Sequence, residues 1–166
     1  MPASMLIQMK KGRDGPSTLA CVRADGTRTW AKLHPFFPAH DLTHCAVETV
    51  FGFDQAFFGL VASGWNIDDL EQPGAAARMP VEALWAEHMV GLLDKDLAAG
   101  QPFQAAAFSD ALAASLSGPA LSPFRAVTEA ELVQVRWLRD HWESQWWALP
   151  PGATLEVAFP AAAAVT

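Results

Sequence analysis

The chain has 166 residues and a formal net charge of −7, and 51% of its residues are hydrophobic. This length suits one domain with a sizeable buried core. We expect residues 1–160 to form that domain, followed by a flexible tail at 161–166. The high apolar content excludes an intrinsically disordered chain. The acidic balance argues against nucleic-acid binding, which requires clustered lysines and arginines to neutralise phosphates.

The sequence also argues against a membrane protein and against an oxidising compartment. No apolar run reaches the roughly 20 residues that span a bilayer, and the N-terminus lacks the layout of a signal peptide. The two cysteines, Cys21 and Cys45, do not form a CxxC metal or redox pair. We therefore expect a soluble, cytoplasmic protein with reduced cysteines and no membrane partner, with a single disulfide as the alternative.

Both ends of the chain carry strand patterns. Three short apolar runs near the N-terminus are separated by turn sequences at 12–16 and at Asp25-Gly26, and this predicts an antiparallel meander. An alternating run near the C-terminus predicts one more strand, which joins the same sheet. The predicted strands span residues 5–9, 17–23, 28–33 and 154–159.

The middle of the chain is predicted to be helical. Pro38 can occupy the first turn of a helix that Gly52 ends, and Thr128-Glu129-Ala130-Glu131 has the capping-box pattern that begins a long helix. Residues 64–79 are expected to form a loop. The predicted helices span about 38–51, 55–63, 81–99, 103–117 and 128–149. The fold class is therefore α+β: a small antiparallel sheet, built from the N-terminal meander and the C-terminal strand, packed with a largely helical middle.

The first predicted helix carries the strongest indication of chemistry. His40 and His44 are four residues apart, so their side chains lie one above the other on a helix. At about 100° per residue, Asp41 and Glu48 share this narrow wall, while Leu42 falls on the opposite, apolar face. Two imidazoles at this spacing beside carboxylates are typical ligands of a divalent metal ion, above all zinc. The pattern therefore predicts a metal site with His40 and His44 as ligands.

The same segment resembles motifs of known families. It is similar to the His-Glu-x-x-His helix of the zincin metal-dependent hydrolases, with Asp41 in place of the glutamate that acts as general base. It also resembles the His-Asp-x-x-His motif of a ubiquinone-biosynthesis family, in which a glutamate occupies the position of Ala56. A group of uncharacterised bacterial proteins has a similar His-Asp-Leu-x-His-x-x-x-Glu helix. The first two resemblances cover only His40 to His44, so neither activity is carried over to this chain.

Two histidines alone do not complete the predicted site, because a catalytic zinc ion usually has three protein ligands and one position for water. Glu48 lies one turn after His44, and it is either a third ligand or a partner that orients His44 through a hydrogen bond. His88 interrupts the apolar stripe of the 81–99 helix and is the best distant ligand. His34 is the second choice and His141 the third. Glu82 and Glu87 are expected to be solvated.

The first functional hypothesis is a metal-dependent hydrolase that acts on a small molecule or a peptide. Asp41 or Glu48 would accept a proton from the metal-bound water, and the 64–79 loop would act as a lid. Aromatic side chains on both sides of the motif are expected to form apolar walls: Phe36, Phe37, Phe57, Phe58 and Trp65.

Two alternatives stay open at this point. A non-catalytic binding or assembly domain would use the His/Asp/Glu cluster as a structural or ordinary polar feature, and exposed aromatic residues would form a homodimer contact. A metal-free lyase or isomerase would use Asp41 and His44 as acid and base. The effect of a chelator on thermal stability, combined with activity screening, distinguishes the hydrolase from the structural alternative.

Overall fold

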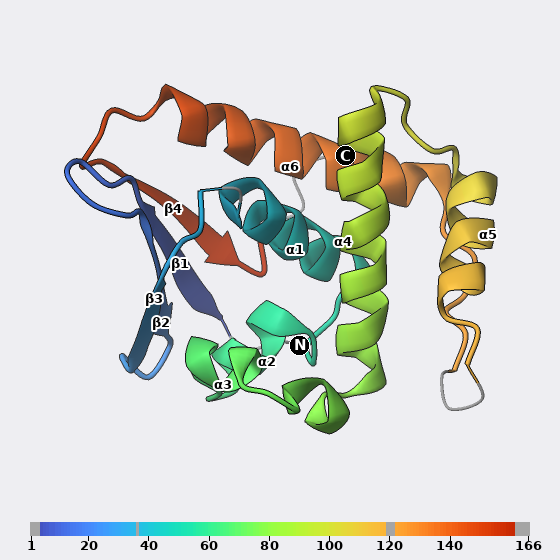
Figure 1. The fold of residues 1–166 in the computed structure, drawn as a ribbon, viewed down its shortest axis with the longest axis horizontal. Coiled ribbons are helices and arrows are strands. Elements are labelled where there is room, and N and C mark those ends of the chain that lie inside the picture. The colour runs from blue at the N-terminus through green and yellow to red at the C-terminus, as the bar shows by residue number, and fades with distance from the viewer. Residues whose placement is uncertain (1–3, 36, 119–121, 162–166) are drawn as a thin grey trace.

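A four-stranded antiparallel sheet forms one end of the computed structural model, which describes residues 4–35, 37–118 and 122–161 (Figure 1). The strand order is β3-β2-β1-β4. β1 (Met5–Lys10) pairs on one side with β2 (Thr18–Arg23) and on the other with β4 (Thr154–Phe159), while β3 (Arg28–Lys32) pairs with β2. The predicted α+β fold, with a sheet drawn from both ends of the chain, is confirmed.

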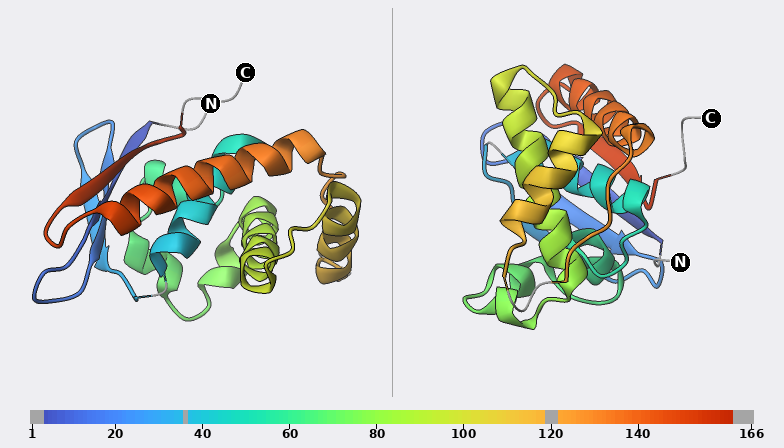
Figure 2. Two further views of the ribbon diagram at one scale, coloured as in Figure 1. Left: turned by 90° about the horizontal axis from the view of Figure 1, so that it is seen from above. Right: turned by 90° about the vertical axis from the view of Figure 1, so that its right-hand side faces the viewer.

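One face of the sheet is buried, because apolar residues alternate along its strands. Met5, Ile7 and Met9 of β1 are buried while the residues between them are not. The same alternation in β4 buries Leu155, Val157 and Phe159. All helices lie on this buried side of the sheet (Figure 2), so a one-residue shift in strand register would expose the whole apolar set.

Helix α1 (Phe37–Phe51) lies between the sheet and the outer helices (Figure 1). It packs mainly against α6 (Glu129–Ala148) and α4 (Val81–Ala99). Pro38 occupies the first turn as predicted, and the capping box of Thr128 and Glu131 begins α6. Within the part of the chain that the structure describes, no helix is long and apolar enough to cross a membrane.

Residues 64–79 are more regular than expected. They contain the short helix α3 (Ile67–Glu71) and the 3₁₀ helix η1 (Ala75–Arg78) rather than a plain loop. The cause is local capping, because the Asn66 and Asp69 side chains form a capping box at the start of α3. The two remaining helices are α2 (Phe57–Ala62) and α5 (Ala105–Ser115), and both lie close to their predicted ranges.

The predicted C-terminal tail at 161–166 lies outside the described residues except for Ala161. The backbone N–H of Ala161 donates a hydrogen bond to the Thr49 hydroxyl, 3.2 Å away. This contact attaches the end of β4 to α1.

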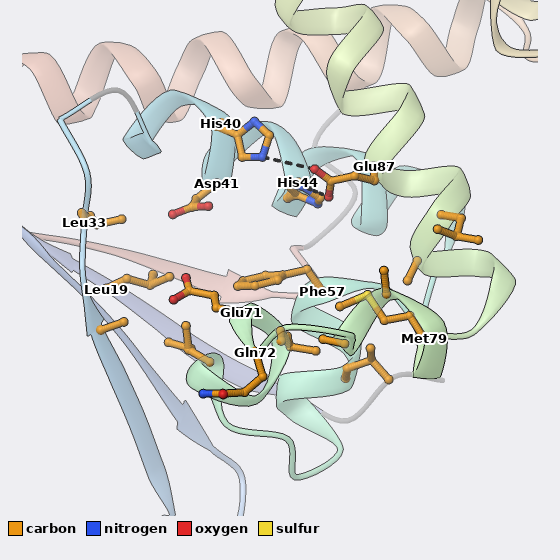
Figure 3. A pocket seen from close by; sticks show the side chains of 18 of the residues that line it. Leu19, Leu33, His40, Asp41, His44, Phe57, Glu71, Gln72, Met79 and Glu87 are labelled. Carbon is orange, nitrogen blue, oxygen red and sulfur yellow. Dashed lines mark ion pairs between the residues drawn. The ribbon is translucent and has the colours of Figure 1, made fainter. Parts of the chain in front are cut away.

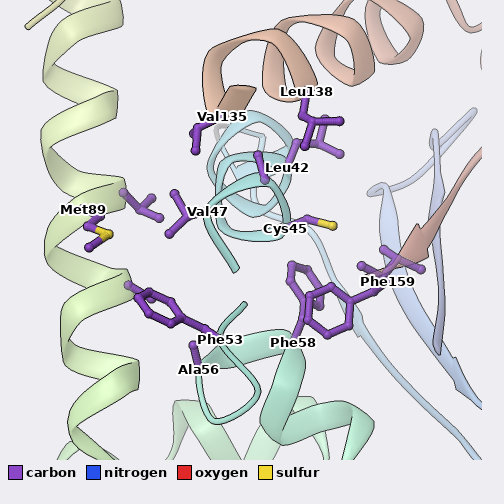
Figure 4. Close-up of a cluster of buried hydrophobic side chains, with 14 of the residues drawn as sticks. Leu42, Cys45, Val47, Phe53, Ala56, Phe58, Met89, Val135, Leu138 and Phe159 are labelled. Carbon is purple, nitrogen blue, oxygen red and sulfur yellow. The ribbon is translucent and has the colours of Figure 1, made fainter. Parts of the chain in front are cut away.

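A continuous apolar core surrounds α1 (Figure 4). Leu42 and Cys45 face α6 and the sheet, and Val47 faces Met89 of α4. Phe58 of α2 packs against Phe159 of β4, with ring centroids 5.9 Å apart. The helix is thus fixed by apolar contacts from several elements, and its polar wall keeps a defined orientation toward α4.

Candidate metal centre

His40 and His44 project from one side of α1 toward α4 (Figure 3). Their ring centroids are 4.8 Å apart, as the i, i+4 spacing requires. His44 is buried, with 3% of its surface exposed, whereas 30% of the His40 side chain is exposed. The pair therefore has one imidazole fixed in the interior and one at the edge of the protein.

Glu87 of α4 closes the group from the opposite side. Its two carboxylate oxygens lie 3.1 Å from His44 Nε2 and 3.7 Å from His40 Nε2. One ligand atom from each of the three residues lies within 4.8 Å of the others. In a tetrahedral zinc site with bonds of about 2.1 Å, neighbouring ligand atoms are roughly 3.4 Å apart. The spacing therefore suits one ion, and the exposed Glu87 side chain has room to adjust.

The second nitrogen of each imidazole also faces a carboxylate. His40 Nδ1 lies 3.0 Å from Asp94 Oδ2 of α4, and His44 Nδ1 lies 3.5 Å from Glu48 Oε2. The second contact is longer than a normal hydrogen bond, and no other described residue bonds either of its two atoms. Carboxylates behind histidine ligands fix the ring orientation in metal sites. Both rings thus present Nε2 toward Glu87.

A glycine accounts for the position of Glu48. The backbone N–H of Gly59 donates to Glu48 Oε1 at 3.1 Å, within the core. A Cβ atom at Gly59 would lie 2.4 Å from the backbone of Asp54, so a larger residue would displace this part of α2. The close approach permitted by Gly59 therefore supplies a donor to a carboxylate that is 1% exposed.

The electrostatics of this group favour positive charge. Burial by itself lowers the pKa of His44, but the adjacent carboxylates of Glu48 and Glu87 outweigh it and raise the pKa to about 10. The hydrogen bond with His44 lowers the pKa of Glu87. Without a metal ion, the group therefore holds a proton on His44. A divalent cation would replace that proton, because histidine binds metals in its neutral form.

The group forms one wall of a cavity of about 450 Å³ (Figure 3). Asp41 lines the same cavity, and burial raises its pKa to about 6 against the opposing effect of the two histidines. Segment 64–79, the predicted lid, contributes part of the lining. Phe57, one of the predicted aromatic wall residues, also lines the cavity. Phe58 lies in the core instead, and Phe36 lies outside the described residues. The remaining lining is largely apolar: Leu19, Ala31, Leu33, Leu60, Ile67, Leu70, Ala75, Met79, Ala83 and Leu84.

The other predicted ligands lie elsewhere. Glu48 is behind His44, where it can orient the ring. His88 is half-buried and lines a second, shallow depression, to which Glu87, Lys95 and Ser115 also contribute. His34 is exposed. His141 stacks on Trp137 of α6, with ring centroids 5.1 Å apart.

Sequence reasoning missed Glu87, because its helical-wheel position indicates a solvated side chain. That side chain is indeed 62% exposed, but it also borders the cavity. One signal was available, since Glu87 and Asp94 are two turns apart and form an acidic stripe on α4. Both carboxylates face His40, Glu87 at Nε2 and Asp94 at Nδ1.

Comparison with known proteins adds no further assignment. No protein-family model, curated protein or solved structure matches the chain. The chemistry of the site therefore provides the basis for a functional conclusion.

Proposed function

We propose that this protein binds a divalent transition-metal ion, with zinc as the expected metal, through His40, His44 and Glu87. We further propose that it uses the ion to hydrolyse a substrate held in the adjacent cavity. One observation carries the proposal: three ligand-type side chains from two helices converge on the wall of a 450 Å³ cavity. Two imidazoles and one carboxylate form a ligand set of catalytic zinc sites, which keep a fourth position for water.

Each surrounding residue then has a distinct role. A bound zinc ion supplies water of lowered pKa, close to 7. Asp41 lines the cavity beside His40, so its carboxylate is the candidate acceptor for the proton of that water. Glu48 and Asp94 lie behind the imidazoles and hold each Nε2 toward Glu87.

Metal uptake tests the proposal directly. Purified protein is stripped with a chelator, loaded with zinc, desalted and analysed for metal content, with Co²⁺ as a spectroscopic probe of the ligand geometry. We expect one ion per chain, and none in a His40→Ala/His44→Ala double variant. Absence of stoichiometric metal in the wild-type protein would overturn the proposal.

A variant that leaves the core intact sharpens this test. Glu87 is exposed, so Glu87→Gln should fold normally yet bind zinc at least about tenfold more weakly, because a neutral amide replaces an anionic ligand. Glu82→Gln is the matched control on the same helix. Its side chain accepts a hydrogen bond from the Gln55 N–H rather than facing the histidines. Equal zinc affinity in wild type and Glu87→Gln would remove Glu87 from the ligand set.

A structural role for the cluster is the second candidate, since Glu87 pairs with both imidazoles and so links α4 to α1. The protein would then be a non-catalytic binding or assembly domain. Thermal unfolding with and without chelator, followed by screening with esters and amides, separates the two. A large loss of stability on chelation without turnover of any substrate favours a structural metal. Turnover that depends on zinc favours the hydrolase.

A further inference from the structure

We infer that the substrate is an uncharged acyl compound, an ester or an amide with an apolar chain. The carbonyl group would lie at the His40/His44/Glu87 wall and the chain in the interior of the cavity. This inference rests on the proposed function, because it assigns a substrate class to the same site. Such a substrate has a head group without negative charge and a long apolar chain.

The lining supports the apolar chain. The walls away from the histidines are formed by aliphatic and aromatic side chains from four elements or their neighbouring segments: Leu19, Phe57, Leu60, Ile67, Leu70 and Met79. The cavity of about 450 Å³ equals the volume of roughly 15 water molecules, which is room for a chain of several carbons in addition to a head group. An apolar chain gains from burial here because it loses contact with water.

The charges around the head group support an uncharged carbonyl. Asp41 lines the cavity beside His40, and Glu71 of α3 lines it from below in Figure 3. Lys32 supplies one compensating positive charge in the lining. The zinc ion itself attracts anions, but a phosphate or carboxylate head group would also face both Asp41 and Glu71, whereas a neutral carbonyl would not be repelled by them.

The hydrolysis balances with water as the co-reactant. Water loses a proton to Asp41, its oxygen bonds to the carbonyl carbon, and the bond from that carbon to the alkoxide oxygen or amine nitrogen breaks. The proton on Asp41 passes to the leaving group, which departs as an alcohol or amine. The second product is a carboxylic acid, which releases its remaining proton to solvent at neutral pH and becomes a carboxylate. Asp41 and Glu71 repel that product, so the arrangement that excludes anionic substrates also promotes product release.

Binding of probes that differ in chain length and in charge tests this substrate class. Zinc-loaded protein is titrated calorimetrically at neutral pH with two sets of probes. Acetohydroxamate and octanohydroxamate test chain length, because both chelate zinc through the same group. We expect octanohydroxamate to bind at least tenfold more tightly than acetohydroxamate, because its chain enters the apolar cavity. The uncharged ketone 2-nonanone, which water cannot cleave, is compared with octanoate and octyl phosphate to test charge, and we expect it to bind more tightly than both anions. Equal affinity for the two hydroxamates, or tighter binding of octyl phosphate than of 2-nonanone, would overturn the inference.

A pair of neighbouring variants locates the bound chain. Ala76 and Ala77 are both exposed in η1, but Ala76 lines the cavity and Ala77 is not among its lining residues. Ala76→Phe should lower the affinity for octanohydroxamate at least tenfold, with zinc content unchanged. Ala77→Phe should leave both the affinity for octanohydroxamate and the zinc content within twofold of wild type. Equal effects of the two variants on the probe would contradict the location.

Zinc content distinguishes failure of the substrate class from failure of the proposed metal-dependent function. Protein that takes up zinc but shows no preference for the long, uncharged probe refutes the substrate class and leaves the metal site standing. Protein that takes up no zinc refutes the proposed function, and the substrate class falls with it.

Discussion

Replacement of Glu48 by glutamine removes the carboxylate behind His44 at nearly constant shape. Glu48 is 1% exposed, its Oε2 lies 3.5 Å from His44 Nδ1, and its Oε1 accepts the Gly59 N–H. The glutamine oxygen can still accept that hydrogen bond. In Glu48→Gln the imidazole loses its anionic partner, so His44 becomes a weaker and less well oriented ligand for a cation.

The expected loss follows from the geometry. Removal of such an outer carboxylate typically lowers metal affinity about 10- to 100-fold, or about 1.4 to 2.7 kcal/mol. The 3.5 Å separation is longer than a normal hydrogen bond, which places the effect near the lower limit. We therefore expect about a tenfold weaker zinc affinity, close to 1.4 kcal/mol, for Glu48→Gln.

Competition of zinc between the protein and a chromophoric chelator measures this affinity. Urea unfolding of the metal-free proteins, run in parallel, shows whether the variant remains folded. Glu71→Gln is the matched control, because it neutralises another carboxylate of the same region that lines the cavity from α3. An affinity of Glu48→Gln within twofold of wild type, or an equal loss in Glu71→Gln, would refute the orienting role of Glu48.

Three further predictions concern stability, measured by urea unfolding. Phe58→Ala should cost about 3–5 kcal/mol, because this buried ring packs on Phe159 of the sheet, and a loss below about 1 kcal/mol would contradict the packing argument. Thr128→Ala removes the N-cap of α6 and should cost about 1 kcal/mol; no change would show that the cap is dispensable. The hydrogen bond with Arg125 lowers the pKa of Glu131 below its usual 4.5. The stabilisation contributed by the ionised Glu131 carboxylate is therefore present above pH 4.5 and is lost as the pH falls through the lowered pKa. The difference in free energy of unfolding between wild type and Glu131→Gln should therefore shrink from pH 6 to about pH 3. A difference that grows on acidification would contradict this sign.

Local patterns in the sequence were enough to predict most of the fold. Alternating apolar residues identified β4, which joins the N-terminal sheet as predicted, and the Thr128/Glu131 pattern located the start of α6. Gly100, with φ of 65°, ends α4 where a glycine was expected to do so. The helices at 64–79 were missed because each is only about one turn long. Such short helices depend on caps and on packing against other elements rather than on a periodic pattern.

The site was only half predictable for a related reason. The i, i+4 spacing placed His40 and His44 together, and it also placed Glu48 one turn beyond His44. The partner helix could not be identified this way, because the contact between α1 and α4 is set by tertiary packing. His88 was preferred over Glu87 since it interrupts an apolar stripe, yet the exposed side of α4 is the side that meets the histidines.

The two halves of the candidate site therefore differ in how firmly the fold holds them. His44 and Glu48 are buried in a helix that contacts the sheet side and α6, and Gly59 fixes the carboxylate behind the ring. Glu87 is exposed, and its position relative to α1 depends on the packing of Met89, two residues further along α4, against Val47 (Figure 4). One buried, firmly held imidazole opposite an adjustable carboxylate suits a site that changes its coordination during a reaction. A purely structural metal site usually has four fixed ligands. This difference in rigidity is a physical reason to test catalysis before a structural role.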